Sequence, residues 1–167
     1  MSKKNLHIVR HGKSSWDYEN ISDIDRPLSP RGINNAYLMA KKLSERKVVP
    51  DRFITSPANR ALYTAIIFAR VLKFPYDKIQ ISDQIYMGHT DDLTRLIRTQ
   101  NKSISNLLIF GHNPAFTALA NQLMDNYIDN IPTAGIVSLS YELDSWDKLG
   151  ETSPAKDFFD YPKRYRK

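Results

Sequence analysis

The stretch LHIVRHG at residues 6–12 constrains the fold of this chain more than any other. It is a short apolar run that stops at a turn residue, a pattern typical of a strand buried on both faces of a sheet. In open α/β sheets, ligands bind beyond the carboxyl ends of such strands. Arg10 and His11 are therefore presented at the edge where a fold of this kind carries out its chemistry.

Strand and helix patterns alternate along the rest of the chain. Two Ser-Pro pairs, at 29–30 and 56–57, each predict a helix start, with Ser as N-cap and Pro at the first helical position. We expect strands at residues 6–9, 52–56, 78–82, 106–111 and 134–141, helices at 29–46, 57–73, 91–101 and 115–124, and a loop at 86–90. This order predicts an α/β fold, a three-layer sandwich with a mostly parallel central sheet and helices on both faces.

Length and composition limit the remaining possibilities. The 167 residues suffice for one domain with a substantial core, so we predict a single domain over residues 1–167. The chain has no cysteine, which excludes a disulfide framework, a thiol nucleophile and a thiolate metal site. A reducing cytoplasm is the expected compartment, because no apolar leader precedes the first strand and no apolar run approaches membrane-spanning length.

The chain is basic, with 24 Lys and Arg against 18 Asp and Glu and a net charge of +6. About half of that excess lies in the last twelve residues. The segment from residue 144 onward is expected to form an edge strand or hairpin, followed by a weakly packed basic tail at about 156–167. A basic chain can bind nucleic acid, but no stacking motif or recognition helix supports this, so we expect no nucleic-acid partner.

Four features fall at matching positions at the ends of the predicted strands. Arg10 and His11 end the first strand, Ser56-Pro57 with Arg60 ends the second, and His112 ends the fourth. A carboxylate-rich region, residues 83–92, follows the third. If the sheet is parallel, all of them lie on one rim, where two arginines, two histidines and helix N-termini would suit a dianion such as phosphate.

Such a site suits phosphoryl transfer through a covalent intermediate without a metal ion. A neutral imidazole is a good nucleophile towards phosphorus, and arginines spread the charge of the transferred group. The second histidine would add a charged donor if protonated. Taken singly these signals are weak, because a histidine at a strand end is more often structural and Ser-Pro before a helix is ordinary capping. Their order and common placement favour the functional interpretation.

These residues resemble the histidine phosphatase superfamily, with its phosphoglycerate-mutase-like fold, and more narrowly the short phosphohistidine phosphatases of the SixA type. The resemblance extends from residue 6 to about residue 139. It rests on the motifs RHGKSSWD at 10–17, DIDRPLSPRG at 23–32, SPANRA at 56–61 with Thr64-Ala65, and GHNP at 111–114.

The resemblance implies that His11 is the phosphorylated nucleophile and that Arg10, Arg60 and His112 form the phosphate pocket around it. Gly12 and Lys13 are expected beside the phosphate. Many members of the superfamily use an acidic residue after the third strand as proton donor to the leaving group, yet residues 85–89 contain no carboxylate. Several nearby side chains are therefore left as candidates for a proton donor or for pocket walls: Asp17, Asp83, Tyr86 and His89.

The missing carboxylate leads to a hypothesis about the substrate. An alkoxide is a poor leaving group and needs a strong acid, whereas an imidazole leaves readily because histidine titrates at about 6.5. We therefore expect a phosphoramidate substrate, phosphohistidine in a protein such as a histidine phosphotransfer domain, and no cofactor. Two alternatives are a phosphomonoesterase or mutase for small phosphorylated metabolites, and a non-catalytic phosphate-binding module.

Overall fold

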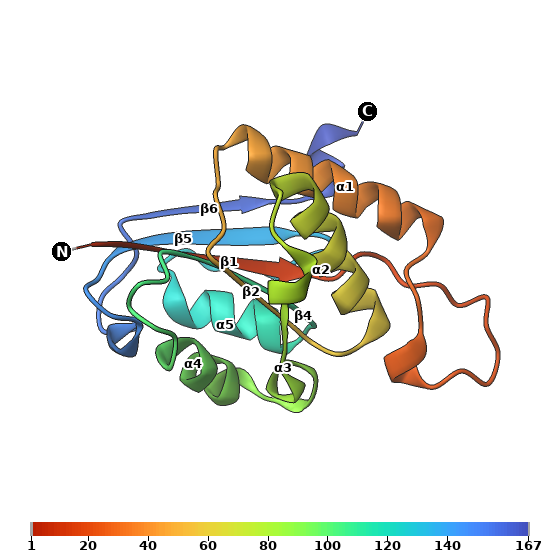
Figure 1. The fold of residues 1–167 in the computed structure, drawn as a ribbon, viewed down its shortest axis with the longest axis horizontal. Coiled ribbons are helices and arrows are strands. Elements are labelled where there is room, and N and C mark those ends of the chain that lie inside the picture. Colours follow the sequence, from red (N-terminus) through yellow and green to blue (C-terminus); the bar gives the residue numbers. More distant parts are fainter. Residues whose placement is uncertain (1, 167) are drawn as a thin grey trace.

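The computed structural model describes residues 2–166, which form one six-stranded sheet with helices on both faces (Figure 1). The strands lie in the order β3-β2-β4-β1-β5-β6. Their bounds are β1 Lys3–Arg10, β2 Arg52–Thr55, β3 Gln80–Ile81, β4 Asn106–Gly111, β5 Ile136–Glu142 and β6 Lys156–Asp160. The predicted α/β fold is confirmed, and the third strand is shorter than expected.

Three of the five strand pairings in the sheet are parallel and two are antiparallel, so the prediction of a mostly parallel sheet holds. Strand β1 pairs in parallel with β4, and β2 pairs in parallel with both β3 and β4. Strands β5 and β6 run antiparallel, so the first residues of β5 lie beside the carboxyl end of β1. The rim that carries Arg10 therefore collects the ends of β1, β2 and β4 together with the segment that enters β5.

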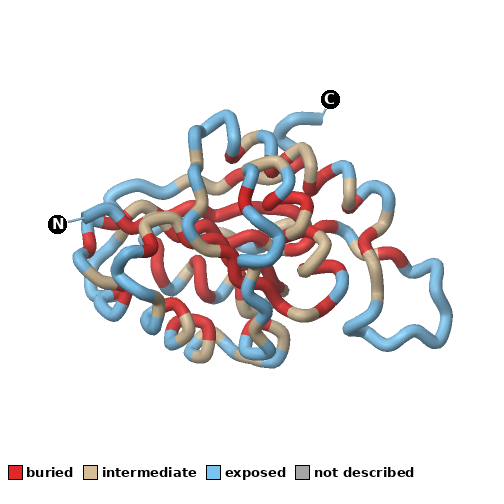
Figure 2. Tube along the Cα trace, in the orientation of Figure 1, coloured by how far each residue is buried: buried red, intermediate tan, exposed pale blue. Residues whose placement is uncertain are grey.

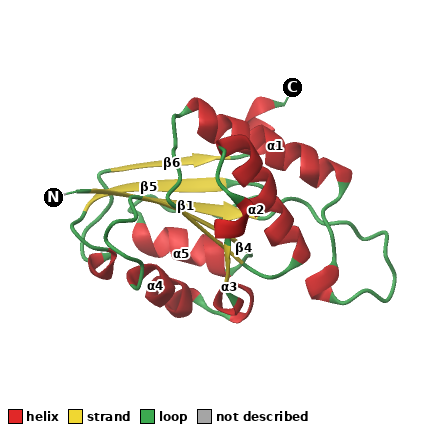
Figure 3. Cartoon of the chain, in the orientation of Figure 1, coloured by secondary structure: helices red, strands yellow, loops and turns green. Residues whose placement is uncertain are grey.

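Helices cover the two faces unequally. Helices α1 Pro30–Glu45 and α2 Asn59–Leu72 pack on one face over a core that includes Val9, Phe53 and Phe110. The other face carries α3 Asp83–Met87, α4 Thr90–Arg98 and α5 Ala115–Leu123, over a core that includes Ile8 and Ile109. Figure 2 shows the buried strands at the centre of the molecule and a long exposed loop that projects beyond them. This loop spans residues 13–28, and Figure 3 draws no strand in it.

The two Ser-Pro pairs behave differently. Ser29 caps α1 as predicted, because its side-chain oxygen accepts a hydrogen bond from the backbone of Gly32 at 3.0 Å. The prediction for Ser56 is wrong: α2 begins at Asn59, and Ser56 precedes its N-cap, Ala58. The Ser56 hydroxyl instead accepts from the Ala58 backbone at 3.1 Å and lies 2.7 Å from His112. A residue expected to cap a helix thus belongs to the strand-end rim.

The segment after β3 is more helical than predicted. Residues 86–90 were expected to be a loop, but Tyr86 lies within the short helix α3. Helix α4 then begins at Thr90, one residue before the predicted start at 91, with His89 as its N-cap. The Asp92 carboxylate accepts a hydrogen bond from the His89 backbone at 2.9 Å, which stabilises this helix start.

The carboxy-terminal segment packs more firmly than expected. Strand β6 pairs with β5, and its last residue, Asp160, is buried. The Asp160 carboxylate accepts a hydrogen bond from the hydroxyl of Tyr165 at 2.7 Å, and Arg166 bonds the side chain of Asn35 on α1. The expected edge strand is thus β6, and these bonds tie the segment after it to the fold, although residues 163–166 are exposed. Lys167 lies outside the described residues. No helix within residues 2–166 is long and apolar enough to cross a membrane.

Candidate functional site

His11 follows the last residue of β1 and is held in one orientation. Its backbone N–H donates to the carbonyl of Gly111 at 3.0 Å, and its Nδ1 lies 2.6 Å from the carbonyl oxygen of Gly12. A carbonyl oxygen only accepts hydrogen bonds, so Nδ1 carries the proton and Nε2 carries the lone pair. The backbone next to His11 is closely packed, because a Cβ on Gly12 would lie 2.7 Å from the carbonyl oxygen of Gly32. The imidazole therefore presents Nε2 as a nucleophile.

The protonation state of His11 follows from its surroundings. Burial lowers its pKa to about 3, and the nearby His112, Arg60 and Arg10 side chains act in the same direction. These effects outweigh the hydrogen bond to Gly12, which favours the charged form. The imidazole is therefore neutral at physiological pH, as a nucleophile must be.

His112 follows β4 and lies beside His11, with 5.1 Å between the two ring centroids. Its Nε2 is 2.7 Å from the hydroxyl of Ser56, and its Nδ1 is buried without a partner among the described residues. Burial, and next the charge of Arg60, lower the pKa of His112 to about 4. His112 is therefore neutral at physiological pH in the empty site, and a bound dianion would raise its pKa.

Two arginines are tied to the rim by backbone oxygens. Arg10 donates from Nη1 to the carbonyl of Ile131 at 2.8 Å. Arg60, in the first turn of α2, donates from Nη1 to the carbonyl of Asp23 at 2.7 Å. One turn later, the hydroxyl of Thr64 donates to the carbonyl of Arg60 at 2.7 Å and accepts from the backbone of Gly12 at 3.0 Å. Thr64 therefore joins the start of α2 to the turn that carries His11.

Asp23, on the long loop, was not among the predicted site residues. Its carboxylate accepts hydrogen bonds from Tyr86 at 2.7 Å and from Arg60 Nη2 at 3.0 Å, and it pairs with Arg26 at 3.3 Å. The Tyr86 hydroxyl, and next Arg60, lower the pKa of Asp23, so this carboxylate stays ionised. The neighbouring Asp25 carboxylate accepts a hydrogen bond from the Ser22 hydroxyl at 2.7 Å.

These side chains surround a cavity of about 350 Å³. Its lining residues are Arg10, His11, Lys13, Ser14, Trp16, Arg26, Arg60, His112, Asn113 and Thr133. The outer wall is formed by Trp16, whose exposed indole lies under the Arg26 guanidinium at 3.9 Å. Six buried side-chain nitrogen or oxygen atoms in residues 2–166 have no hydrogen-bond partner, and four of them belong to this lining: the Nε atoms of Arg10, Arg26 and Arg60 and Nδ1 of His112.

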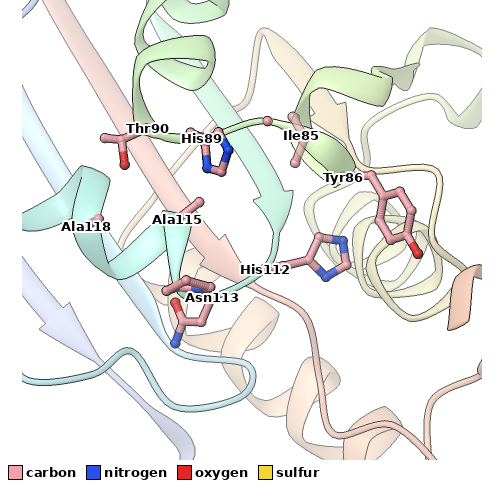
Figure 4. A pocket seen from close by; sticks show the side chains of 10 residues that line it. Ile85, Tyr86, His89, Thr90, His112, Asn113, Ala115 and Ala118 are labelled. Carbon is pink, nitrogen blue, oxygen red and sulfur yellow. The ribbon is translucent and has the colours of Figure 1, made fainter.

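A second hollow of about 270 Å³ adjoins the first and shares His112 and Asn113 with it. Figure 4 shows its walls, with Tyr86 next to His112 and His89 across the hollow. The edge contact between Tyr86 and His112 has a centroid separation of 5.5 Å. The remaining walls are largely apolar and come from α3 and α5, including Ile85, Pro114 and Ala115. The rim thus combines a cationic cavity with an apolar one.

Comparison with known proteins identifies the family. The family model for the histidine phosphatase superfamily, branch 1, matches residues 6–102. The chain belongs to the histidine phosphatase superfamily. The chain is 28% identical over 141 residues to the uncharacterized protein Rv1276c of Mycobacterium tuberculosis, which covers 78% of this chain and 85% of that protein. It is 41% identical over 64 residues to phosphoglycerate mutase 1 of Saccharomyces cerevisiae, which covers 37% of this chain and 26% of that protein.

Solved structures extend the likeness to the whole fold of the chain. The protein histidine phosphatase SixA complexed with tungstate matches with a TM-score of 0.82 at 22% identity, covering 97% of this chain and 99% of that chain. The resemblance to the superfamily and to SixA that the motifs indicated is thereby confirmed at the level of family and fold.

The structure brings together some of the predicted residues and separates others. Arg10, His11, Lys13, Arg60 and His112 line one cavity, whereas Gly12 is not among its lining residues and contacts His11 through its carbonyl oxygen. Of the candidates for a proton donor or pocket wall, Tyr86 and His89 line the apolar hollow, whereas Asp17 and Asp83 line neither cavity.

The sequence did not predict three residues that hold the side chains of the site in place: Ser56, Thr64 and Asp23. Ser56 and Thr64 lie within motifs that were noted, but a hydroxyl that bonds a histidine looks the same in sequence as one that caps a helix. Asp23 acts across the fold, because it bonds residues 37 and 63 positions away.

Proposed function

We propose that this histidine phosphatase hydrolyses phosphoryl groups through a phosphohistidine intermediate on His11, and that its substrate is phosphohistidine in a protein. The observation that carries the first part is the convergence at one cavity. A neutral histidine with a fixed tautomer lies among four buried nitrogen atoms, three of arginines and one of His112, that have no partner within the described chain. Buried polar groups in proteins are nearly always paired, so such a cluster indicates a place for an anionic ligand.

The residues support a two-step reaction. In the first step, the lone pair of His11 Nε2 forms a bond to phosphorus as the bond to the leaving group breaks. In the second step, water attacks the same phosphorus, the bond to Nε2 breaks, and inorganic phosphate leaves. Arg10, Arg60 and His112 bind the phosphoryl oxygens in both steps and stabilise the charge that develops on them. The hydrogen bond from Nδ1–H to Gly12 keeps the imidazole oriented throughout.

The environment of the leaving group supports phosphohistidine as the substrate. Asp23, the carboxylate nearest to the arginines, is ionised and accepts hydrogen bonds, so it is poorly suited to donate a proton. The phenol of Tyr86, whose pKa is raised chiefly by its bond to Asp23, is an even weaker acid. An imidazole leaving group needs little protonation by the protein, and the adjoining apolar hollow suits a flat ring.

A substrate series with graded leaving groups tests this specificity. Phosphohistidine and aryl phosphates are expected to turn over much faster than simple alkyl phosphates, and the logarithm of kcat/KM should fall as the leaving-group pKa rises. Equal rates for alkyl phosphates and phosphohistidine would contradict the proposal. Acid-labile, base-stable phosphate trapped on the protein by quenching, and absent from the His11→Ala variant, would report the intermediate independently of the substrate.

A small-metabolite phosphatase or mutase remains the second candidate, because part of the chain is 41% identical to a phosphoglycerate mutase. A mutase must hold its phosphoryl group until a second acceptor arrives, so its phosphoenzyme resists water. The half-life of the isolated phosphoenzyme distinguishes the two reactions. Rapid hydrolysis supports the phosphatase, whereas a stable phosphoenzyme that transfers to a phosphorylated sugar acid supports the mutase. Phosphate binding without any turnover would indicate a binding module.

A further inference from the structure

A third hollow, lined mostly by polar residues, includes residues near the amino ends of β1 and β4. Figure 1 shows these strand ends at the opposite end of the sheet from the rim that carries His11. Strand register places Asn106, Asn5 and Ser140 side by side in one row, and His7 beside Ser138 in the next. These positions alternate with the core, so they lie on the face that α1 and α2 cover nearer the rim. Central strands covered on both faces are usually apolar, so this polar group is unusual.

These polar side chains form the floor of the hollow, whose volume is about 570 Å³. Its walls come from the turn after α1, with Arg46, Lys47 and Val48, and from β6, with Lys156, Asp157 and Phe158. Three cationic residues thus line the hollow with one carboxylate.

His7 is the deepest polar group of this floor. Only 4% of its surface is exposed, and burial lowers its pKa to about 4, against a smaller opposite effect of Asn106, so the ring is neutral. Its Nδ1 lies 2.7 Å from the hydroxyl of Ser138. Its Nε2 has no partner at normal hydrogen-bond geometry within residues 2–166, although the Asn106 side chain is close enough to act on the ring. The cavity around His11, at the other end of the sheet, also contains buried side-chain atoms without a hydrogen-bond partner.

Helix capping alone does not account for the cationic residues that line this hollow. Basic residues after a helix stabilise its negative end, which accounts for Arg46 and Lys47 by themselves. Lys156, however, comes from β6, and Arg46 is held over the ring of Phe158 on that strand at 3.7 Å. Positive charge therefore converges from two separate elements above a floor of amides, hydroxyls and an imidazole.

We propose that this hollow is a second binding site, for a phosphorylated sugar. Its phosphate lies near Arg46, Lys47 and Lys156, and its hydroxyls exchange hydrogen bonds with the floor. Asn and Ser side chains both donate and accept, as sugar hydroxyls require, and His7 Nε2 gains the partner that the chain does not supply. The proposal is independent of the reaction at His11, because the two cavities share no residue.

Calorimetric titration with glucose 6-phosphate, inorganic phosphate and glucose as probes tests this site. Vanadate at saturating concentration is kept in the cell so that the His11 cavity is filled. Glucose 6-phosphate is expected to bind one molecule per chain, more tightly than phosphate or glucose alone. Backbone amide resonances of residues 5–7 and 138–140 should shift on binding.

Two variants complete the test. The double variant Lys47→Glu, Lys156→Glu should weaken binding of glucose 6-phosphate by about tenfold or more. The double variant Lys102→Glu, Lys148→Glu, which makes the same charge change at two exposed lysines away from the hollow, should leave the affinity unchanged. Ser140→Leu fills the floor without changing charge and should also weaken binding. Absence of binding in the presence of vanadate, or equal affinity in all variants, would mean a merely hydrated groove and would overturn the proposal.

Discussion

The ends of β1 and β4 each present a histidine, buried for His11 and half-buried for His112, and the two differ in what holds them. His11 donates from Nδ1 to a carbonyl oxygen, which fixes its tautomer and leaves Nε2 free to attack. His112 contacts the hydroxyl of Ser56, which can donate or accept, so either tautomer or the imidazolium can be accommodated. The difference indicates that the two histidines have separate roles. We infer that His11 is a nucleophile whose protonation state stays constant, and that His112 is an oxyanion ligand whose protonation state can change.

The largest expected effect comes from removing the nucleophile. His11→Ala should lower kcat/KM for an aryl phosphate by about 10⁴-fold or more, because the covalent pathway is lost while the anion site remains. Vanadate affinity and the far-UV circular dichroism spectrum serve as controls for the site and the fold. Residual activity within about tenfold of the wild type would show that His11 and His112 do not differ in the way their contacts indicate.

The next effect comes from the oxyanion ligand. His112→Ala should lower kcat by about 10²- to 10³-fold, the range typical for loss of one donor to a developing oxyanion. The phosphoenzyme should still form in a single-turnover experiment, only more slowly. His112→Gln, which keeps a donor of similar reach, should recover part of the rate. Complete loss of the phosphoenzyme in both variants would make His112 part of the nucleophilic step instead.

Measuring the protonation state of each imidazole distinguishes the two histidines directly. Without an anion, burial keeps both pKa values low, at about 3 for His11 and about 4 for His112. Vanadate places negative charge beside both rings, which raises the pKa of His112 into the neutral range while His11 keeps its proton on Nδ1. Nitrogen-15 chemical shifts of the imidazoles measure this. A doubly protonated His11 imidazole in the presence of vanadate at pH 7 would contradict the proposed difference between the two histidines.

The same low pKa values predict an acid-sensitive fold. The unfolded chain takes up protons on these histidines as the pH falls below about 6.5, whereas the folded chain takes them up only near the lower values. The free energy of unfolding should therefore fall as the pH is lowered from 6.5 towards 4, as urea titrations can measure. His11→Asn should make this fall less steep. An unchanged slope would show that His11 is protonated in the folded state.

The sequence predicted the α/β fold and the strand ends because those depend on local patterns. The apolar runs that became β1 and β4 end in Arg-His-Gly and Gly-His, and both histidines lie at the rim. Contacts across the fold could not be read in this way. Asp23 reaches Arg60 and Tyr86 from a loop whose course depends on packing, and Tyr86 itself was expected in a loop.

The smallest effect concerns Asp23, which holds Arg60 beside the two histidines. Asp23→Asn keeps the shape but loses the charge, so Arg60 should be held less firmly. Because 53% of the Asp23 side chain is exposed, the ion pair is worth about 1 kcal/mol or less. We expect KM to rise by no more than about fivefold, with kcat nearly unchanged. Asp25→Asn is the matched control, since Asp25 bonds Ser22 and does not line the cavity. A large fall in kcat for Asp23→Asn alone would instead place this carboxylate in the proton transfers, and the division of roles between His11 and His112 would have to include it.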